Sequence, residues 1–170
     1  MKGCTVVVTR AADRARPLVD ALTGAGAAVV EVPVVRFEAP ADGGGALAAA
    51  VADPTRYAWV VFTSAVAVAR TLEVVGVPGR LASLKVAVVG PATAAAVEAV
   101  GLAVTVVASP ATAEGLVASM PDAVAPVPNV LYPRAAGARD AVAAGLRAKG
   151  YEVEDIEAYR TVAVPIDDLR

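Results

Sequence analysis

Polar side chains able to bind an anion follow several predicted strands, at the point where each strand ends. They are Thr63, Ser64, Thr93 and Arg134. In an open α/β sheet, ligands bind beyond the carboxyl ends of the parallel strands. The helices that begin there present free backbone N–H groups and the positive end of a dipole, which favour carboxylates and phosphates. The positions of these side chains therefore predict an anion-binding edge of a sheet.

Each of these side chains also has a purely structural interpretation. A Ser or Thr between a strand and a helix commonly caps the helix by accepting a hydrogen bond from a backbone N–H group. An Arg at such a position is commonly a solvated surface residue. The local sequence leaves both interpretations open.

The composition excludes several kinds of catalysis. The 170 residues include no histidine, which rules out Ser-His-Asp and Cys-His mechanisms and removes the commonest metal ligand. The single cysteine, Cys4, can form no disulfide within the chain and opens a predicted buried strand, where we expect a small core residue. A net charge of −2 gives no basis for binding nucleic acid or an anionic membrane. Because we find neither a signal peptide nor a membrane-spanning run, we expect a cytoplasmic protein.

The elements that must position these residues alternate between short apolar strands and helices, which is typical of an α/β fold. Two strands, at residues 4–8 and 28–32, precede a Pro- and Gly-rich segment at residues 40–45. Five more strands follow it, beginning at Tyr57, Lys85, Ala103, Asn129 and Tyr151. The five later strands suffice for a complete doubly wound domain, whereas two strands and one helix do not bury a core alone.

Local signals set the boundaries of the two elements nearest the candidate residues. The run Tyr57–Phe62 is apolar and short, which is typical of a strand buried on both faces, and the pattern of Ala65–Val75 is helical. We expect Pro133-Arg134 to end the strand at residues 129–132. We then expect a helix over Ala136–Lys149, closed by Gly150.

The order of the motifs resembles the uroporphyrinogen-III synthase family. The matching segments are Thr9-Arg10, Pro33, Phe62-Thr63-Ser64-Ala65 with Ala67-Val68, Val89-Gly90-Pro91-Ala92-Thr93-Ala94, Ala113-Glu114-Gly115-Leu116, Leu131 to Arg134, and Ala158-Tyr159-Arg160-Thr161. The resemblance rests on the order and spacing of these segments over nearly the whole chain.

The resemblance implies two flavodoxin-like α/β domains, each a parallel sheet flanked by helices, joined by a two-stranded β-ladder. Residues 1–34 would be the first half of domain one, and residues 40–156 a complete domain two. Residues 35–39 and 157–164 would form the ladder. The tail at residues 165–170 would lead to a second half of domain one that this chain lacks, so that domain one is only half present.

The resemblance also implies an activity. Members of the family cyclise hydroxymethylbilane, a linear tetrapyrrole, to uroporphyrinogen III, inverting the last pyrrole ring and losing water. This hydro-lyase step of heme biosynthesis needs neither a cofactor nor a metal. Tyr159 is the implied proton donor or positioning group near the leaving hydroxyl, although a half-buried ladder aromatic would look the same. The implied substrate-binding residues are Thr9, Arg10, Thr63, Ser64, Gly90, Thr93 and Arg134.

One departure from the family pattern and two alternative functions accompany this interpretation. Family members often have Asn where this chain has Val66, so the amide hydrogen bonds of that turn are absent. The first alternative is a non-catalytic domain of the same architecture that binds a small carboxylate or phosphate. The second is an inactive scaffold fragment that self-associates through the unfinished domain one, because such a unit exposes apolar surface and a strand edge.

Overall fold

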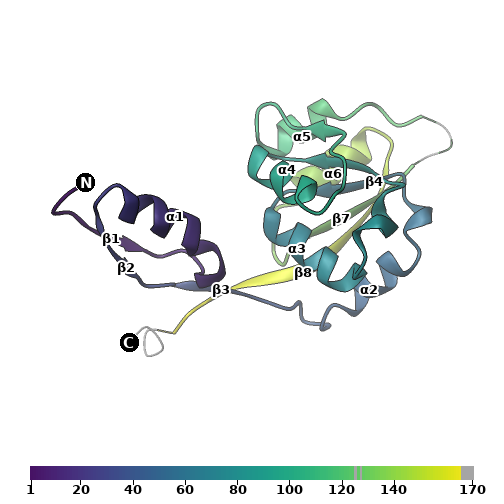
Figure 1. Ribbon diagram of the computed structural model, residues 1–170. Coiled ribbons are helices and arrows are strands. Elements are labelled where there is room, and N and C mark those ends of the chain that lie inside the picture. The colour runs from purple at the N-terminus through teal and green to yellow at the C-terminus, as the bar shows by residue number, and fades with distance from the viewer. Residues whose placement is uncertain (125, 127, 166–170) are drawn as a thin grey trace. The chain divides into compact units, whose positions relative to one another are not determined.

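The computed structural model describes residues 1–124, 126 and 128–165. Of the tail expected at residues 165–170, only Pro165 is therefore among the described residues. The chain divides into two compact units (Figure 1). Unit 1 comprises Met1–Glu38 and the chain from Arg160 onward, and unit 2 comprises Ala39–Tyr159.

Strands and helices alternate through both units. In chain order they are β1 (Thr5–Val8), α1 (Ala12–Gly24), β2 (Ala28–Glu31), β3 (Val35–Glu38), α2 (Gly45–Ala52), the 3-10 helix η1 (Pro54–Arg56), β4 (Trp59–Phe62), α3 (Ala65–Val75), the 3-10 helix η2 (Pro78–Leu81), β5 (Lys85–Val88), α4 (Pro91–Glu98), β6 (Val106–Val107), α5 (Ala113–Ser119), β7 (Asn129–Ala135), α6 (Ala141–Ala148) and β8 (Glu152–Ala163). Within the described residues, no helix is long and apolar enough to cross a membrane.

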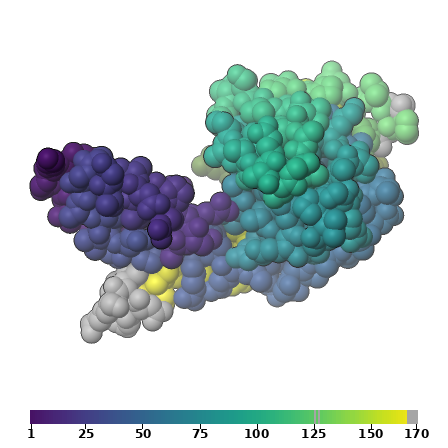
Figure 2. Space-filling model, in the orientation of Figure 1, coloured from purple at the N-terminus to yellow at the C-terminus, as the bar shows by residue number. Residues whose placement is uncertain are grey.

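The sheet of unit 2 is parallel and doubly wound, in the order β8-β7-β4-β5-β6. Its central strand, β4, is buried at every residue, which confirms the prediction of a strand covered on both faces. Helix α3 begins and ends at the predicted residues and packs against α2 and α4. In the space-filling view these helices, drawn in blue to teal, cover the near side of unit 2 (Figure 2).

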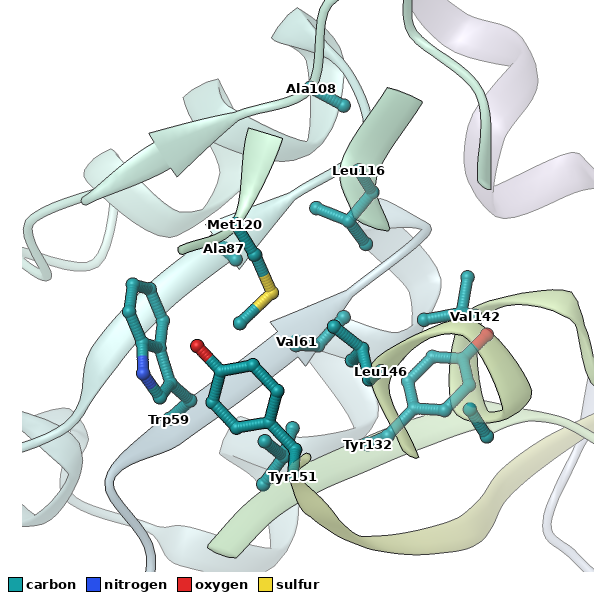
Figure 3. Close-up of a cluster of buried hydrophobic side chains, with 12 residues drawn as sticks. Trp59, Val61, Ala87, Ala108, Leu116, Met120, Tyr132, Val142, Leu146 and Tyr151 are labelled. Carbon is teal, nitrogen blue, oxygen red and sulfur yellow. The ribbon is translucent and has the colours of Figure 1, made fainter. Parts of the chain in front are cut away.

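The other face of this sheet packs against α5 and α6. Leu116 and Met120, from α5 and its end, meet Val142 and Leu146 of α6 over the strands (Figure 3). The strands contribute every second residue, as the pleat requires; on β4 these are Trp59 and Val61. The cluster fixes α5 and α6, whose amino-terminal ends border the candidate site.

Two boundaries near Arg134 differ from the prediction. β7 continues through Pro133 to Ala135 instead of ending at Tyr132. Proline is tolerated there because the ladder with β4 extends only to Leu131, so that β7 has one paired neighbour at this point. α6 begins at Ala141, since residues 136–140 form a loop in which Gly137 has a φ of 67°.

β6 is shorter than expected, because residues 103–105 lie outside its ladder. The Thr105 hydroxyl accepts the hydrogen bond of the Val86 N–H group, at 3.2 Å, in place of a backbone carbonyl. The Thr105 N–H group in turn donates to the Val86 carbonyl at 2.8 Å. A side chain thus accepts one of the two hydrogen bonds at the start of the ladder, and the backbone makes the other.

The amino-terminal part of unit 1 contains one parallel strand pair, β1 with β2, and one helix, α1. A single helix can cover only one face of the pair, so among the described residues the other face is uncovered. Cys4 is exposed, and the expectation that it is a core residue is wrong because β1 begins only at Thr5, so that Cys4 lies before the strand. β3 pairs antiparallel with the second half of β8, from Val35 opposite Ala163 to Glu38 opposite Arg160.

Candidate functional site

A pocket of about 360 Å³ opens in unit 2 at the carboxyl ends of β4, β5 and β7, where open α/β sheets bind ligands. It is lined by Thr63, Val89, Thr112, Ala113, Glu114, Tyr132, Ala138, Arg139, Ala141 and Val142. Of the predicted site residues only Thr63 lines it. The pocket nevertheless lies at the edge that the sequence indicated.

Ser64 caps a helix and also contacts a second predicted site residue. Its Oγ accepts a hydrogen bond from the Ala67 N–H group at 3.1 Å and so caps α3. The same Oγ lies 3.1 Å from the phenol oxygen of Tyr159, a hydrogen bond in which either oxygen can donate. Two predicted site residues, 95 positions apart in the chain, therefore meet.

A β-bulge turns Tyr159 inward. The register between β7 and β8 shifts after Arg134, so that Ala135 faces Tyr159 and Ala158 is passed over. As a result two consecutive residues, Ala158 and Tyr159, are buried, which a regular strand with one solvated face does not allow. The bulge brings the phenol to Ser64.

Tyr132 is a second tyrosine at this edge, and sequence reasoning did not select it. Its side chain is buried beside Val142 (Figure 3) and it lines the pocket. Burial raises the pKa of Tyr132, and a hydrogen bond with Thr63 opposes the rise only in part. The phenol therefore stays protonated near neutral pH and can donate a hydrogen bond. The sequence feature that could have pointed to Tyr132 was its place directly before Pro133, at the expected end of the strand.

Arg134 is engaged within unit 2. Its Nε and Nη2 lie 3.0 and 2.9 Å from Oδ2 of Asp155, and its Nη1 donates to the Ala138 carbonyl at 3.2 Å. The side chain is only 20% exposed, so it is not a solvated surface Arg. A direct contact of Arg134 with substrate stays a prediction, and the structure gives its guanidinium other partners.

Asp155 is the partner that sequence reasoning missed. Burial would raise the pKa of Asp155, but hydrogen bonds from Arg147 and Arg134 outweigh burial and hold this pKa below its usual value. Asp155 lies in an alternating acidic segment, which looks like a solvated strand face in the sequence. Only the fold shows that two arginines converge on it.

The remaining predicted residues lie outside this pocket. Thr93 is buried in the first turn of α4, and Gly90 is the residue at which that helix is capped. Thr9 and Arg10 are exposed residues of unit 1, between β1 and α1. Their contacts with substrate stay predictions.

The segment Ala113-Glu114-Gly115 begins α5 beside the pocket, and the packing of that helix explains why these residue types occur there. Thr112 caps α5 by accepting a hydrogen bond from the Gly115 N–H group at 3.0 Å. A Cβ atom at Gly115 would collide with the carbonyl oxygen of Pro110, so only glycine fits. The close approach leaves the exposed side chain of Glu114 at the rim of the pocket.

Charge at the pocket comes from Glu114 and Arg139. In residues 1–124, 126 and 128–165, no group of His, Cys, Asp and Glu side chains could hold a metal ion. The arrangement offers hydrogen-bond donors, one cation and one carboxylate. It can orient a polar ligand and transfer a proton through a phenol.

The fold is that of an α/β protein with a candidate pocket at the carboxyl edge of a parallel sheet. A family model described as "Uroporphyrinogen-III synthase HemD" matches residues 16–170. The chain belongs to the uroporphyrinogen-III synthase family.

Relatives with a curated name and solved structures agree with this assignment. The uroporphyrinogen-III synthase of Synechococcus elongatus is 31% identical over 163 residues, which cover 94% of this chain and 61% of that protein. A mutant uroporphyrinogen III synthase from Thermus thermophilus shares the fold with a TM-score of 0.69 at 19% identity, covering 96% of this chain and 64% of that one. The Helicobacter pylori enzyme matches with a TM-score of 0.55 at 14% identity, covering 100% of this chain and 68% of the other.

The comparisons confirm the α/β fold class that the sequence predicted. They also show that the chain spans about three-fifths of the length of the curated relative.

Proposed function

We propose that this chain takes part in the uroporphyrinogen-III synthase reaction, the cyclisation of hydroxymethylbilane to uroporphyrinogen III in heme biosynthesis. The activity of the relatives belongs to longer proteins, of which this chain matches 61% and 64%. We further propose that unit 2 corresponds to domain two of the family and unit 1 to half of domain one. In this interpretation the partner is a small molecule, neither nucleic acid nor a membrane, and the protein works in the cytoplasm.

The observation that supports this function is the Ser64–Tyr159 hydrogen bond at the carboxyl edge of unit 2. In the proposed reaction the phenol of Tyr159 gives its proton to the leaving hydroxyl of the bilane. The C–O bond breaks, water leaves, and the electron-rich pyrrole carries the positive charge. Because the last ring is inverted, the new C–C bond forms at the α-carbon of that ring that already carries a methylene bridge. The old bond to that bridge then breaks, the bridge rejoins the ring at its free α-carbon, and the proton displaced there returns to the phenolate of Tyr159. Ser64 positions the phenol, because its own oxygen is fixed by the Ala67 N–H group.

Whether ring closure inverts the last pyrrole depends on how the protein holds the linear tetrapyrrole. Holding reacting ends together can lower a barrier by roughly 7–11 kcal/mol, which requires neither histidine nor metal. The carboxylates of the substrate suit arginine and hydroxyl donors such as Arg139, Thr63 and Tyr132. These side chains supply orientation, and Tyr159 supplies the proton.

An isomer assay tests the function. Freshly generated hydroxymethylbilane is added to the protein at several concentrations, and the oxidised products are separated into type I and type III porphyrins. Type I forms without a catalyst, so it is an internal blank. We expect type III above that blank; type I alone at every concentration would contradict the proposal.

A non-catalytic binder of a small carboxylate is the second candidate, favoured by the exposed cation at the pocket, Arg139. Such a protein would retain a porphyrin ligand but form no type III product. The discriminating variant is Tyr159→Phe, which in a binder would leave porphyrin binding unchanged.

Self-association is a further proposal, because unit 1 leaves an apolar face open. Val7 and Val30 face each other across the β1–β2 ladder and are 56% and 46% exposed. Apolar side chains on an uncovered strand pair favour association. Sedimentation velocity at several protein concentrations tests this: we expect a mass that rises with concentration in the wild type and less in Val7→Asp. A constant monomer mass would contradict it.

A further inference from the structure

The loop at residues 136–140, between β7 and α6, is held by arginines on both sides. Arg134 precedes the loop and donates to the Ala138 carbonyl within it. Arg147, on α6, lies 3.6 Å from the carboxylate of Asp140 at the other end of the loop. The two arginines therefore clamp the loop at its middle and at its end.

A single carboxylate joins the two halves of this clamp. Oδ2 of Asp155 accepts from Arg134, and Oδ1 accepts from Arg147 at 2.7 Å. Arg147 also donates to the Val153 carbonyl at 3.0 Å, which ties it to β8. Because Arg134 and Asp155 are only 20% and 22% exposed, these charge-assisted bonds are partly shielded from water and hold their geometry.

Arg139 is the residue that the clamped loop presents to the pocket. Within the described part of the chain its guanidinium has no ion-pair partner, and its side chain is exposed. The same pocket is lined by Thr63 and Tyr132, whose side chains carry hydroxyl groups. A cation and hydroxyl groups in one pocket match a carboxylate. The Glu114 carboxylate at the rim disfavours an anion of higher charge, such as a phosphate dianion.

We propose that Arg139 contacts a carboxylate of the tetrapyrrole in this pocket, and that Arg134 is a positioning residue that holds the loop of Arg139 through Asp155. The inference rests on the proposed function for the identity of the ligand. It moves the contact with the anion from Arg134, which the sequence indicated, to a residue five positions further on. The role of Arg134 then follows from its bond to Ala138.

A double-mutant cycle with uroporphyrin III, the oxidised product, tests the proposal by fluorescence titration. We expect Arg139→Ala to weaken binding roughly tenfold, the loss of one charge-assisted hydrogen-bonded pair, and Arg139→Lys to recover part of it. Arg134→Ala should weaken binding in the wild-type background but not in the Arg139→Ala background, because Arg134 acts through Arg139. The matched control is Arg16→Ala, which removes an 84% exposed arginine of unit 1 and should change nothing.

Hydrogen exchange separates positioning from general destabilisation. Backbone amides of residues 136–140 should exchange several-fold faster in Arg134→Ala and Arg134→Lys, while the amides of β4 keep wild-type protection. Lysine is included because it preserves the charge and the fold but cannot form the same fork of bonds. Unchanged exchange in the loop of both variants would overturn the positioning role.

Porphyrin binding requires no ring closure, so this proposal and the synthase reaction fail separately. Additive losses in the Arg134–Arg139 cycle, or no binding of uroporphyrin III by the wild type, would overturn the inference even if type III product forms. A coupled cycle in a protein that yields only type I product would support the inference and reject the synthase reaction.

Discussion

Strand β1 of unit 1 and strand β4 of unit 2 have similar apolar sequences but opposite degrees of burial. β1 reads Thr-Val-Val-Val and buries only its last residue, whereas β4 reads Trp-Val-Val-Phe and buries all four. β4 has neighbours on both sides and helices on both faces, whereas within the described residues β1 pairs with β2 alone, under one helix. An apolar strand sequence thus indicates what a strand can bury. Whether it does so depends on how many layers the rest of the chain supplies.

The same difference separates the candidate site residues. In unit 2 the completed sheet carries a defined pocket, a capped helix and the Ser64–Tyr159 hydrogen bond. In unit 1 the corresponding strand-to-helix junction leaves Thr9 and Arg10 exposed. Preorganised side-chain geometry is found where both faces of the sheet are covered.

The largest expected contrast between the units is in core stability. Leu146→Ala removes a fully buried side chain of unit 2, and we expect a loss of about 2–5 kcal/mol. Val7→Ala shortens an exposed side chain of unit 1, and we expect a change within about 0.5 kcal/mol. Urea titrations followed by circular dichroism measure both. Equal losses would mean that the open face of unit 1 is buried in solution.

Two glycines, one in each unit, allow the packing of the backbone in unit 2 to be compared with that in unit 1. Gly115→Ala should cost about 1–3 kcal/mol, because the new methyl group meets the Pro110 carbonyl. Gly24→Ala, at the end of α1, has open space and should be neutral or stabilise by up to about 1 kcal/mol. Thermal unfolding of the two variants gives the comparison. A tolerated alanine at position 115 would contradict the close approach.

The smallest contrast concerns ion pairs and depends on pH. Asp155→Asn should cost about 1–2 kcal/mol at pH 7, because two arginines lose a partly buried carboxylate. The pKa of Asp155 is lowered, so its contribution is complete above the unfolded-state pKa of about 3.9 and is lost as the pH falls through the lower folded value. The penalty of the variant should therefore shrink below about pH 4.

The matched control is Asp20→Asn in unit 1, where an exposed pair with Arg16 should contribute less than about 0.5 kcal/mol at any pH. Denaturant titrations from pH 3 to pH 7 follow both variants. A penalty for Asp155→Asn that does not change with pH would show that the carboxylate contributes by packing alone.

Local sequence patterns predicted the parts of unit 2 that depend on local physics. The bounds of α3, the burial of β4 and the cap at Ser64 follow from apolar periodicity and capping chemistry. The end of β7 could not be predicted in this way, because its passage through Pro133 depends on pairing with β8. Exposure of Cys4 likewise could not be predicted from the apolar run, because β1 begins only at Thr5.

The site shows the same division. The family resemblance named Ser64 and Tyr159 as site residues, but their hydrogen bond was not predicted, since the bulge that turns Tyr159 inward has no local signal. Tyr132 and Asp155 were missed, because their importance comes from partners in other parts of the fold. These partners are Thr63 for Tyr132, and the two arginines Arg134 and Arg147 for Asp155. Residues whose roles depend on long-range pairing needed the structure.

The rate of type III formation by Tyr159→Phe tests the central claim most directly. The control is Tyr151→Phe, which loses a phenol that donates to the Pro121 carbonyl, outside the lining of the candidate pocket. We predict that Tyr159→Phe lowers the rate at least about a hundredfold, the usual contribution of a proton donor, and that Tyr151→Phe keeps it within a few-fold of wild type. A Tyr159→Phe protein that is folded and forms type III product at the wild-type rate would contradict the account.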